Sequence, residues 1–236
     1  GIVFRFFDRS FYLNMKTMID FFRSRKLIKL GLALGFISAI QIIFISLLPS
    51  ELSSNDSMDY DIYYSVMAER IAENGEFVSS FYFNDHVASD KSGEFVTRFP
   101  PGHPLIIAAT YWTSDQLGVS RDKLIKLTFV LFYALSACLI YKIAGLFFNG
   151  WIPYLSTIIW VLYPFNLWIT KQPNSEIPFL LFFLWAIYFF LIGTISNSSK
   201  YILMASILIS AAMLTRAISL LVPVIFVISY ILSSNY

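Results

Sequence analysis

Acidic side chains are concentrated in one stretch of the chain, between residues 50 and 122. This stretch holds twelve of the 15 Asp and Glu residues, whereas Asp8 and Asp20 precede it and Glu176 follows it. A carboxylate next to a hydroxyl group can take its proton, so general base catalysis is the first chemistry that these residues suggest. The carboxylates could also hold a divalent metal ion, but their spacing is not diagnostic of such a site.

Two of these acids, Asp59 and Asp61, fall in the first turn of a predicted amphipathic helix at the membrane surface. Apolar side chains recur at helical spacing at Tyr60, Tyr64, Met67, Ala68 and Ile71. Asn55 or Asp56 can cap the start of this helix, and Asn74-Gly75 is typical of its end. The acids either favour the helix dipole or include one that faces a reaction centre, and the pattern leaves both interpretations open.

A rigid turn leads from Arg98 into a short apolar helix. Three prolines and one glycine between residues 100 and 104 restrict the backbone. The apolar stretch that follows, up to Trp112, is too short to cross a membrane and suits a re-entrant or interfacial helix. His103 stands at its start, where it either caps the turn or contacts a ligand.

Two ionisable side chains stand at the ends of apolar runs. Glu176 begins one run, after a polar connection that contains Lys171, and Arg216 separates two others. An unpaired charge at membrane depth is expensive to bury, so both are candidate functional residues. They can also form a structural ion pair that ties two helix ends together, and the two interpretations are compatible.

The composition is typical of a membrane protein. Hydrophobic residues make up 57% of the 236-residue chain and charged residues only 14%, with a mean hydropathy of +0.67. A soluble domain has about 25% charged residues, and a disordered chain has low hydrophobicity. The single Cys138 excludes a disulfide scaffold.

Six apolar runs predict membrane-spanning helices. They cover residues 30–49, 124–148, 151–170, 177–195, 201–214 and 217–232. The runs are too long and too uniformly apolar for barrel strands. The expected fold class is all-α: a polytopic transmembrane helical bundle of about six spans, with amphipathic interfacial helices in an outer-face loop between spans one and two.

Basic residues gather before the first apolar run, which sets the expected orientation. They are Arg5, Arg9, Lys16, Arg23, Arg25, Lys26 and Lys29. By the positive-inside rule the N-terminus is cytoplasmic. The expected organisation is a cytoplasmic basic juxtamembrane segment, residues 1–29, and a transmembrane domain, residues 30–236, that includes the outer loop 50–122. Any chemistry of the carboxylates then takes place on the periplasmic, extracellular or lumenal face.

The order of these motifs resembles that of the GT-C membrane glycosyltransferases, in particular the protein-mannosyltransferase-like and aminoarabinose-transferase-like group. The matching motifs are an Asp-x-x-Tyr-x-x-x-Ala helix (Asp61, Tyr64, Ala68), the Pro-Pro-Gly-His-Pro turn, Ser175-Glu176 and Leu214-Thr215-Arg216. The resemblance runs from about residue 30 to the C-terminus. Members of this group are usually longer, with more spans, so an N-terminal fragment, a truncated product and a minimal member all stay open.

The resemblance implies an activity and a partner set. Such enzymes move a sugar from a dolichyl- or undecaprenyl-type phosphate donor to a hydroxyl group of a glycan, lipid or protein acceptor, on the outer face. Membrane lipids are further partners, and neither a nucleic acid nor a cofactor beyond the donor is implied.

The resemblance also assigns residues to roles. Asp61 or Asp59 would be the catalytic base, and the register of the motif leaves both open. The donor phosphate would be bound by Arg216 as the best match, followed by His103, Arg98 and Lys171. Glu176 and Tyr64 would support the site.

Two other functions compete with this one. A transporter or lipid-carrier flippase could also place prolines and ionisable groups in its spans, but the spans carry few charges at mid-depth and no inverted repeat is visible. A non-catalytic, truncated homologue that acts as a membrane scaffold is the third alternative.

Overall fold

Helices make up almost all of the described structure, as the composition predicts. The computed structural model describes residues 26–47, 64–77, 82–83, 86–87, 100–169 and 173–234. The helices are α2 (Lys26–Leu47), α4 (Ser65–Asn74), α5 (Gly102–Leu117), α6 (Arg121–Phe147), α7 (Ile152–Leu162), α8 (Pro164–Ile169), α9 (Glu176–Ile195), α10 (Ser199–Thr215), η3 (Ala217–Ser219) and α11 (Val222–Ser234). The described strands, β1 (Tyr82–Phe83) and β2 (His86–Val87), form a two-residue antiparallel pair. The all-helical fold class is confirmed apart from this short pair.

The apolar runs that were expected to span a membrane are helical, but they differ in length. Helices α6 and α9 are long and apolar enough to cross a membrane. Shorter apolar helical stretches cover Leu32–Leu47, Ile152–Leu162, Ser199–Thr215 and Ala217–Leu232. By length and composition the described residues therefore support two spans, and the count of six stays a prediction.

The third run is not one continuous helix. Helix α7 ends at Leu162, Tyr163 is extended with φ −64° and ψ 120°, and α8 begins at Pro164. Proline has no N–H group and disfavours helical geometry in the residue before it. The third run was expected to be one membrane-spanning segment over residues 151–170, and the structure divides it into two helices at the residue before Pro164.

The break frees backbone carbonyl groups inside the bundle, and side chains bind them. The Asn166 Nδ2 atom donates a hydrogen bond to the Trp160 carbonyl at 3.0 Å. The Tyr133 hydroxyl donates to the Val161 carbonyl, also at 3.0 Å. These bonds satisfy acceptors that the interrupted helix cannot, so the break is stable in an apolar environment.

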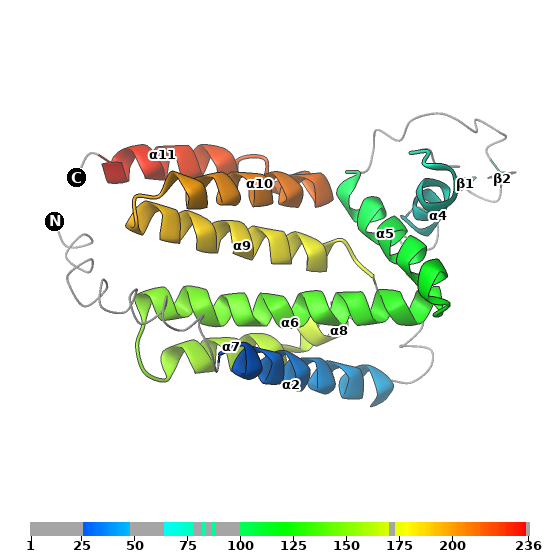
Figure 1. Cartoon of the computed structure of the whole chain (residues 1–236), viewed down its shortest axis with the longest axis horizontal. Helices are drawn as coiled ribbons and strands as arrows, with labels where there is room; N and C mark the ends of the chain where they lie inside the picture. Colours follow the sequence, from blue (N-terminus) through cyan, green and yellow to red (C-terminus); the bar gives the residue numbers. More distant parts are fainter. Residues whose placement is uncertain are drawn as a thin grey trace.

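Helix α6 runs through the middle of the bundle. It contacts α2, α5, α7 and α9 (Figure 1). A buried cluster of Ile37, Tyr133, Ala134, Ala137 and Val161 joins α2, α6 and α7. Helices α9 and α10 form a tight hairpin, and a Cβ atom added at Gly193 would lie 2.7 Å from Ile202 Cδ1.

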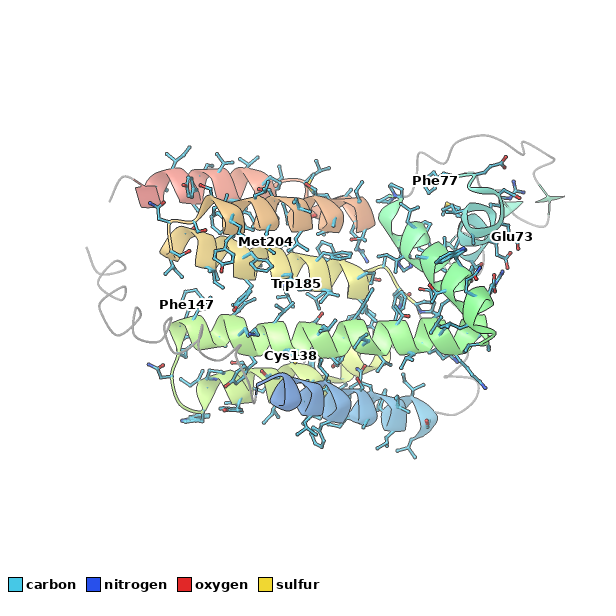
Figure 2. All side chains as sticks on the ribbon, viewed as in Figure 1. Glu73, Phe77, Cys138, Phe147, Trp185 and Met204 are labelled. Carbon is cyan, nitrogen blue, oxygen red and sulfur yellow. The ribbon has the colours of Figure 1, made fainter. Side chains whose placement is uncertain are left out.

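The two helices of the expected interfacial loop lie at one end of this bundle. Figure 1 shows α4 and α5 at the end where α6 and α9 begin and α10 finishes. Ala68 of α4 packs in one cluster with Ile107 and Tyr111 of α5 and with Phe129 of α6. In Figure 2, oxygen and nitrogen atoms are concentrated around α4 and α5, with Glu73 among the labelled residues.

The boundaries of these two helices agree with the sequence prediction in part. Helix α4 ends at Asn74, and Gly75 follows with a left-handed φ of 70°, as the Asn-Gly pair predicted. Helix α5 continues beyond Trp112 to Leu117. The predicted start at Asn55 or Asp56 lies outside the described residues.

Helices α5 and α10 touch through their backbones at Gly102. A Cβ atom added there would lie 2.7 Å from the Leu214 carbonyl carbon and oxygen, and 2.9 Å from the Thr215 nitrogen. Backbone atoms cannot move aside as the tip of a side chain can. Only glycine therefore allows the first turn of α5 to rest on the last turn of α10.

We expect Gly102→Ala to destabilise the protein by about 1–3 kcal/mol, because it overpacks this contact. The matched control is Gly145→Ala in α6, where an added Cβ atom meets no atom within 4 Å and alanine is the better helix former by about 1 kcal/mol. Thermal unfolding of both variants in detergent measures the difference. Equal unfolding temperatures would contradict the proposed backbone contact.

Candidate functional site

His103 is fully buried at the start of α5. Its Nε2 atom lies 2.9 Å from the carbonyl oxygen of Pro173, in the connection before α9. The Tyr64 ring and the imidazole form a T-shaped pair with 4.5 Å between centroids, and the Phe129 ring of α6 lies at 5.8 Å. His103 thus joins the segment before α4, helix α6 and the connection before α9.

The His103 imidazole is neutral. Burial lowers its pKa to about 3, against the raising effect of the Pro173 hydrogen bond, and the nearby positive charge of Arg216 lowers it further. Because a carbonyl can only accept, Nε2 carries the proton. The Nδ1 atom then has a free lone pair and is buried without a hydrogen-bond partner among the described residues.

Arg216 stands where α10 ends. Its backbone is extended, with φ −150° and ψ 123°, so the helix cannot continue through it. The Nη1 atom donates to the Ser175 hydroxyl at 3.3 Å and forms an ion pair with Glu176. The Arg216 and Glu176 side chains are 36% and 44% exposed, so a ligand can still reach both.

These contacts bring four separate stretches of the chain together. We call the group of Tyr64, His103, Ser175, Glu176 and Arg216 the bundle-end site. The backbone contact between α5 and α10 places His103 near Arg216, and Pro173 links the histidine to the loop that carries Ser175 and Glu176. Four residues expected in a functional site from the sequence, Tyr64, His103, Glu176 and Arg216, are therefore neighbours in the structure.

Four further candidate residues lie outside the described part of the chain. They are Asp59, Asp61, Arg98 and Lys171. Their roles stay predictions.

Two contacts of the site were not anticipated from the sequence. The Pro173 carbonyl binds His103, and residue type carries no signal for a backbone acceptor. Ser175 was visible only as part of the Ser-Glu motif, yet its hydroxyl accepts a hydrogen bond from Arg216.

The described part of the bundle-end site suits an anion. The start of α9, a helix of 20 residues, carries partial positive charge, and the Arg216 guanidinium adds a full one. Glu176 balances this charge in the structure. No group of three or more His, Cys, Asp or Glu side chains that could hold a metal ion occurs in the described ranges.

The neutral, buried His103 makes stability depend on pH. Its folded pKa of about 3 lies below the unfolded value of 6.5, so the unfolded chain binds more protons between these values. Unfolding free energy should therefore fall as pH falls through this window, by up to about 1.4 kcal/mol per pH unit.

The check is thermal unfolding in detergent between about pH 7 and pH 5. His103→Asn keeps a hydrogen-bond donor but cannot titrate, so we expect a weaker pH dependence than in the wild type. An unchanged slope in His103→Asn would refute the assignment.

Comparison with known proteins identifies a family that this chain matches. The family model described as dolichyl-phosphate-mannose-protein mannosyltransferase matches residues 102–236, from the start of α5 to the C-terminus. No curated protein and no solved structure matches the chain significantly. The matched region includes His103, Glu176 and Arg216, and it covers more than half of the chain. The chain therefore belongs to the dolichyl-phosphate-mannose-protein mannosyltransferase family, a family of GT-C-type membrane glycosyltransferases.

Proposed function

We propose that this protein transfers a sugar from a polyprenyl-phosphate donor, of dolichyl or undecaprenyl type, to a hydroxyl group of an acceptor on the outer face of the membrane. The observation that carries the proposal is the position of Arg216 beside the start of α9, at the bundle end where His103 and the interfacial helices meet. Family membership supports the reaction class.

Arg216 is the described residue best suited to bind the donor phosphate. A guanidinium binds phosphate oxygens through charge-assisted hydrogen bonds. In the structure Arg216 is ion-paired with Glu176, and both side chains are partly exposed. A phosphate entering the bundle-end site would compete with Glu176 for Arg216, and the Ser175 hydroxyl would be available as a further hydrogen-bond donor.

His103 belongs to the same proposed site but brings no positive charge. Its buried imidazole donates a hydrogen bond to the Pro173 carbonyl, which fixes the connection that leads through Ser175 into Glu176, the first residue of α9. Arg98 and Lys171 are proposed as further phosphate-binding residues on the basis of sequence position. Lys171 is two residues before Pro173, and Arg98 is two residues before Pro100.

The proposed general base is Asp61 or Asp59. Asp61 lies three residues before Tyr64, whose ring contacts His103. A peptide chain spans at most about 3.6 Å per residue, so Asp61 is tethered within about 11 Å of Tyr64. The acid-bearing segment is therefore attached directly to the bundle-end site.

The proposed reaction is a single displacement. The acceptor oxygen forms a bond to the anomeric carbon of the sugar while the bond from that carbon to the phosphate oxygen breaks. The Asp carboxylate takes the proton of the hydroxyl group, and the polyprenyl phosphate leaves with its negative charge. Arg216 stabilises that charge as it develops. The acceptor can be a glycan, a lipid or a protein.

The proposed topology is six spans with a cytoplasmic N-terminus. The turns at residues 149–150 and 196–198 lie at the end of the bundle opposite α4 and α5. Lys142 in the last part of α6 and Lys200 at the start of α10 belong to that end, which fits the positive-inside rule. The bundle-end site then faces the outside.

Arg216→Gln should lower the rate of sugar transfer by about 100- to 1,000-fold, as expected when a charge-stabilising donor is lost. The measurement is transfer of labelled sugar from a polyprenyl-phosphate donor in proteoliposomes. Lys200→Gln removes a basic residue at the other end of the same helix and serves as the control. Full activity of Arg216→Gln would exclude the proposed phosphate site.

Replacing the base should abolish transfer without loss of folded protein. We expect either Asp61→Asn or Asp59→Asn to reduce the rate by about 100- to 10,000-fold, whichever residue is the base, whereas Glu94→Gln in the same acidic stretch should have little effect. Single-turnover transfer and size-exclusion profiles are measured together. A fully active Asp59→Asn, Asp61→Asn double variant would rule out this mechanism.

A further inference from the structure

Arg121 is an unusual first residue for α6. The start of a helix carries partial positive charge, so a basic side chain there is disfavoured. Arg121 nevertheless begins this 27-residue helix, next to the favourable Asp122. Other contacts must therefore offset the unfavourable position of its positive charge at the helix start.

The compensation comes from two other helices. The Nε and Nη2 atoms of Arg121 donate to the two oxygens of Asp115 at 3.0 and 2.7 Å, a bidentate pair. The guanidinium also forms ion pairs with Glu69 at 3.4 Å and with Glu73 at 3.9 Å, and it lies 4.8 Å from the centre of the Tyr111 ring. These hydrogen bonds hold the pKa of Asp115 below its ordinary value.

We call this group of Arg121, Asp115, Glu69 and Glu73 the Arg121 clasp. Asp115 and Tyr111 belong to α5, and Glu69 and Glu73 belong to α4. One guanidinium therefore connects α4 and α5 to the first turn of α6. The side chains are 31% to 60% exposed, where a lone ion pair contributes little. Here a bidentate pair, two further carboxylates and an aromatic ring share one cation, which favours one fixed geometry.

Helix α4 needs such an attachment. It has ten residues, of which Met67 and Ala68 are buried, and a helix this short is marginal by itself. Its N-terminal neighbour Tyr64 contacts His103. With a rise of 1.5 Å per residue, Glu69 and Glu73 stand about 8 and 14 Å along the axis from Tyr64. Contacts at Tyr64 and at the two glutamates together fix the direction of α4 and its rotation about its own axis.

We propose that Arg121 is a positioning residue for the transfer reaction: the clasp holds α4 so that Tyr64, directly before this helix, stays in contact with His103 of the bundle-end site. This inference rests on the proposed function. Arg121 touches neither donor nor acceptor in this scheme and acts through α4.

Arg121→Gln should lower kcat by about 10- to 100-fold, the effect expected when a catalytic group is misplaced by about 1 Å. The KM for the polyprenyl-phosphate donor should stay within about twofold, because Arg216 and α9 are untouched. Arg121→Lys keeps the charge but loses the planar fork and should recover part of kcat. Lys123→Gln is the matched control, since this exposed residue lies two positions further along α6 and belongs to none of these ion pairs.

Two further measurements separate positioning from a general loss of structure. Amide hydrogen exchange of residues 65–74 should be at least about tenfold faster in Arg121→Gln than in Lys123→Gln, with no change in α9. Adding Asp115→Asn to Arg121→Gln should change kcat by less than about twofold, because the two residues act through one contact.

The outcomes are distinct. A wild-type protein that transfers no sugar overturns the proposed function and this inference with it. An active wild type with a normal kcat in Arg121→Gln overturns the inference alone. A rise in KM that accounts for the whole defect, or unchanged exchange in α4, also contradicts it.

Discussion

The backbone of α5 rests on the backbone of α10 at Gly102, and the rest of the bundle-end site depends on this contact. The approach leaves no room for a Cβ atom beside the Leu214 carbonyl and the Thr215 nitrogen. It places His103, the next residue, beside the end of α10 and within reach of the Pro173 carbonyl. Arg216 is the residue directly after the end of α10. Helix α5 is thereby held in register with α9 and α10 through backbone atoms, which cannot move aside as the tip of a side chain can.

The burial of His103 at this helix contact also determines where charge lies in the site. A charged imidazole in this apolar setting would be costly, so the side chain is neutral and holds its neighbours by one hydrogen bond and by ring contacts with Tyr64 and Phe129. The positive charge of the described site is then concentrated on Arg216 and the start of α9. Because His103 at the centre of the site is neutral, the positive charge of Arg216 at its edge is available to a ligand.

Much of this arrangement could be predicted from residue type and spacing. The helical class, the end of α4 at Asn74-Gly75 and the neighbouring positions of His103, Glu176 and Arg216 follow from hydropathy, turn chemistry and the order of motifs. The break at Tyr163 has a local signal in Pro164, whereas the Pro173 acceptor and the Arg121 clasp have none. Each of these two contacts depends on which backbone carbonyl or distant carboxylate the folded chain brings near, and no local pattern carries that information.

The ion pair between Arg216 and Glu176 explains how a membrane-edge cation can be kept ready for a ligand. An isolated guanidinium in a poorly solvated place is unfavourable. Glu176 neutralises it, and partial exposure of both side chains keeps the pair weaker than a buried one. A phosphate group that displaces Glu176 exchanges one ionic contact for another, while the released carboxylate is returned to water. Under the proposed function, the affinity for the donor phosphate depends on the difference between two ion pairs, so that the donor would bind and the polyprenyl phosphate product would still leave.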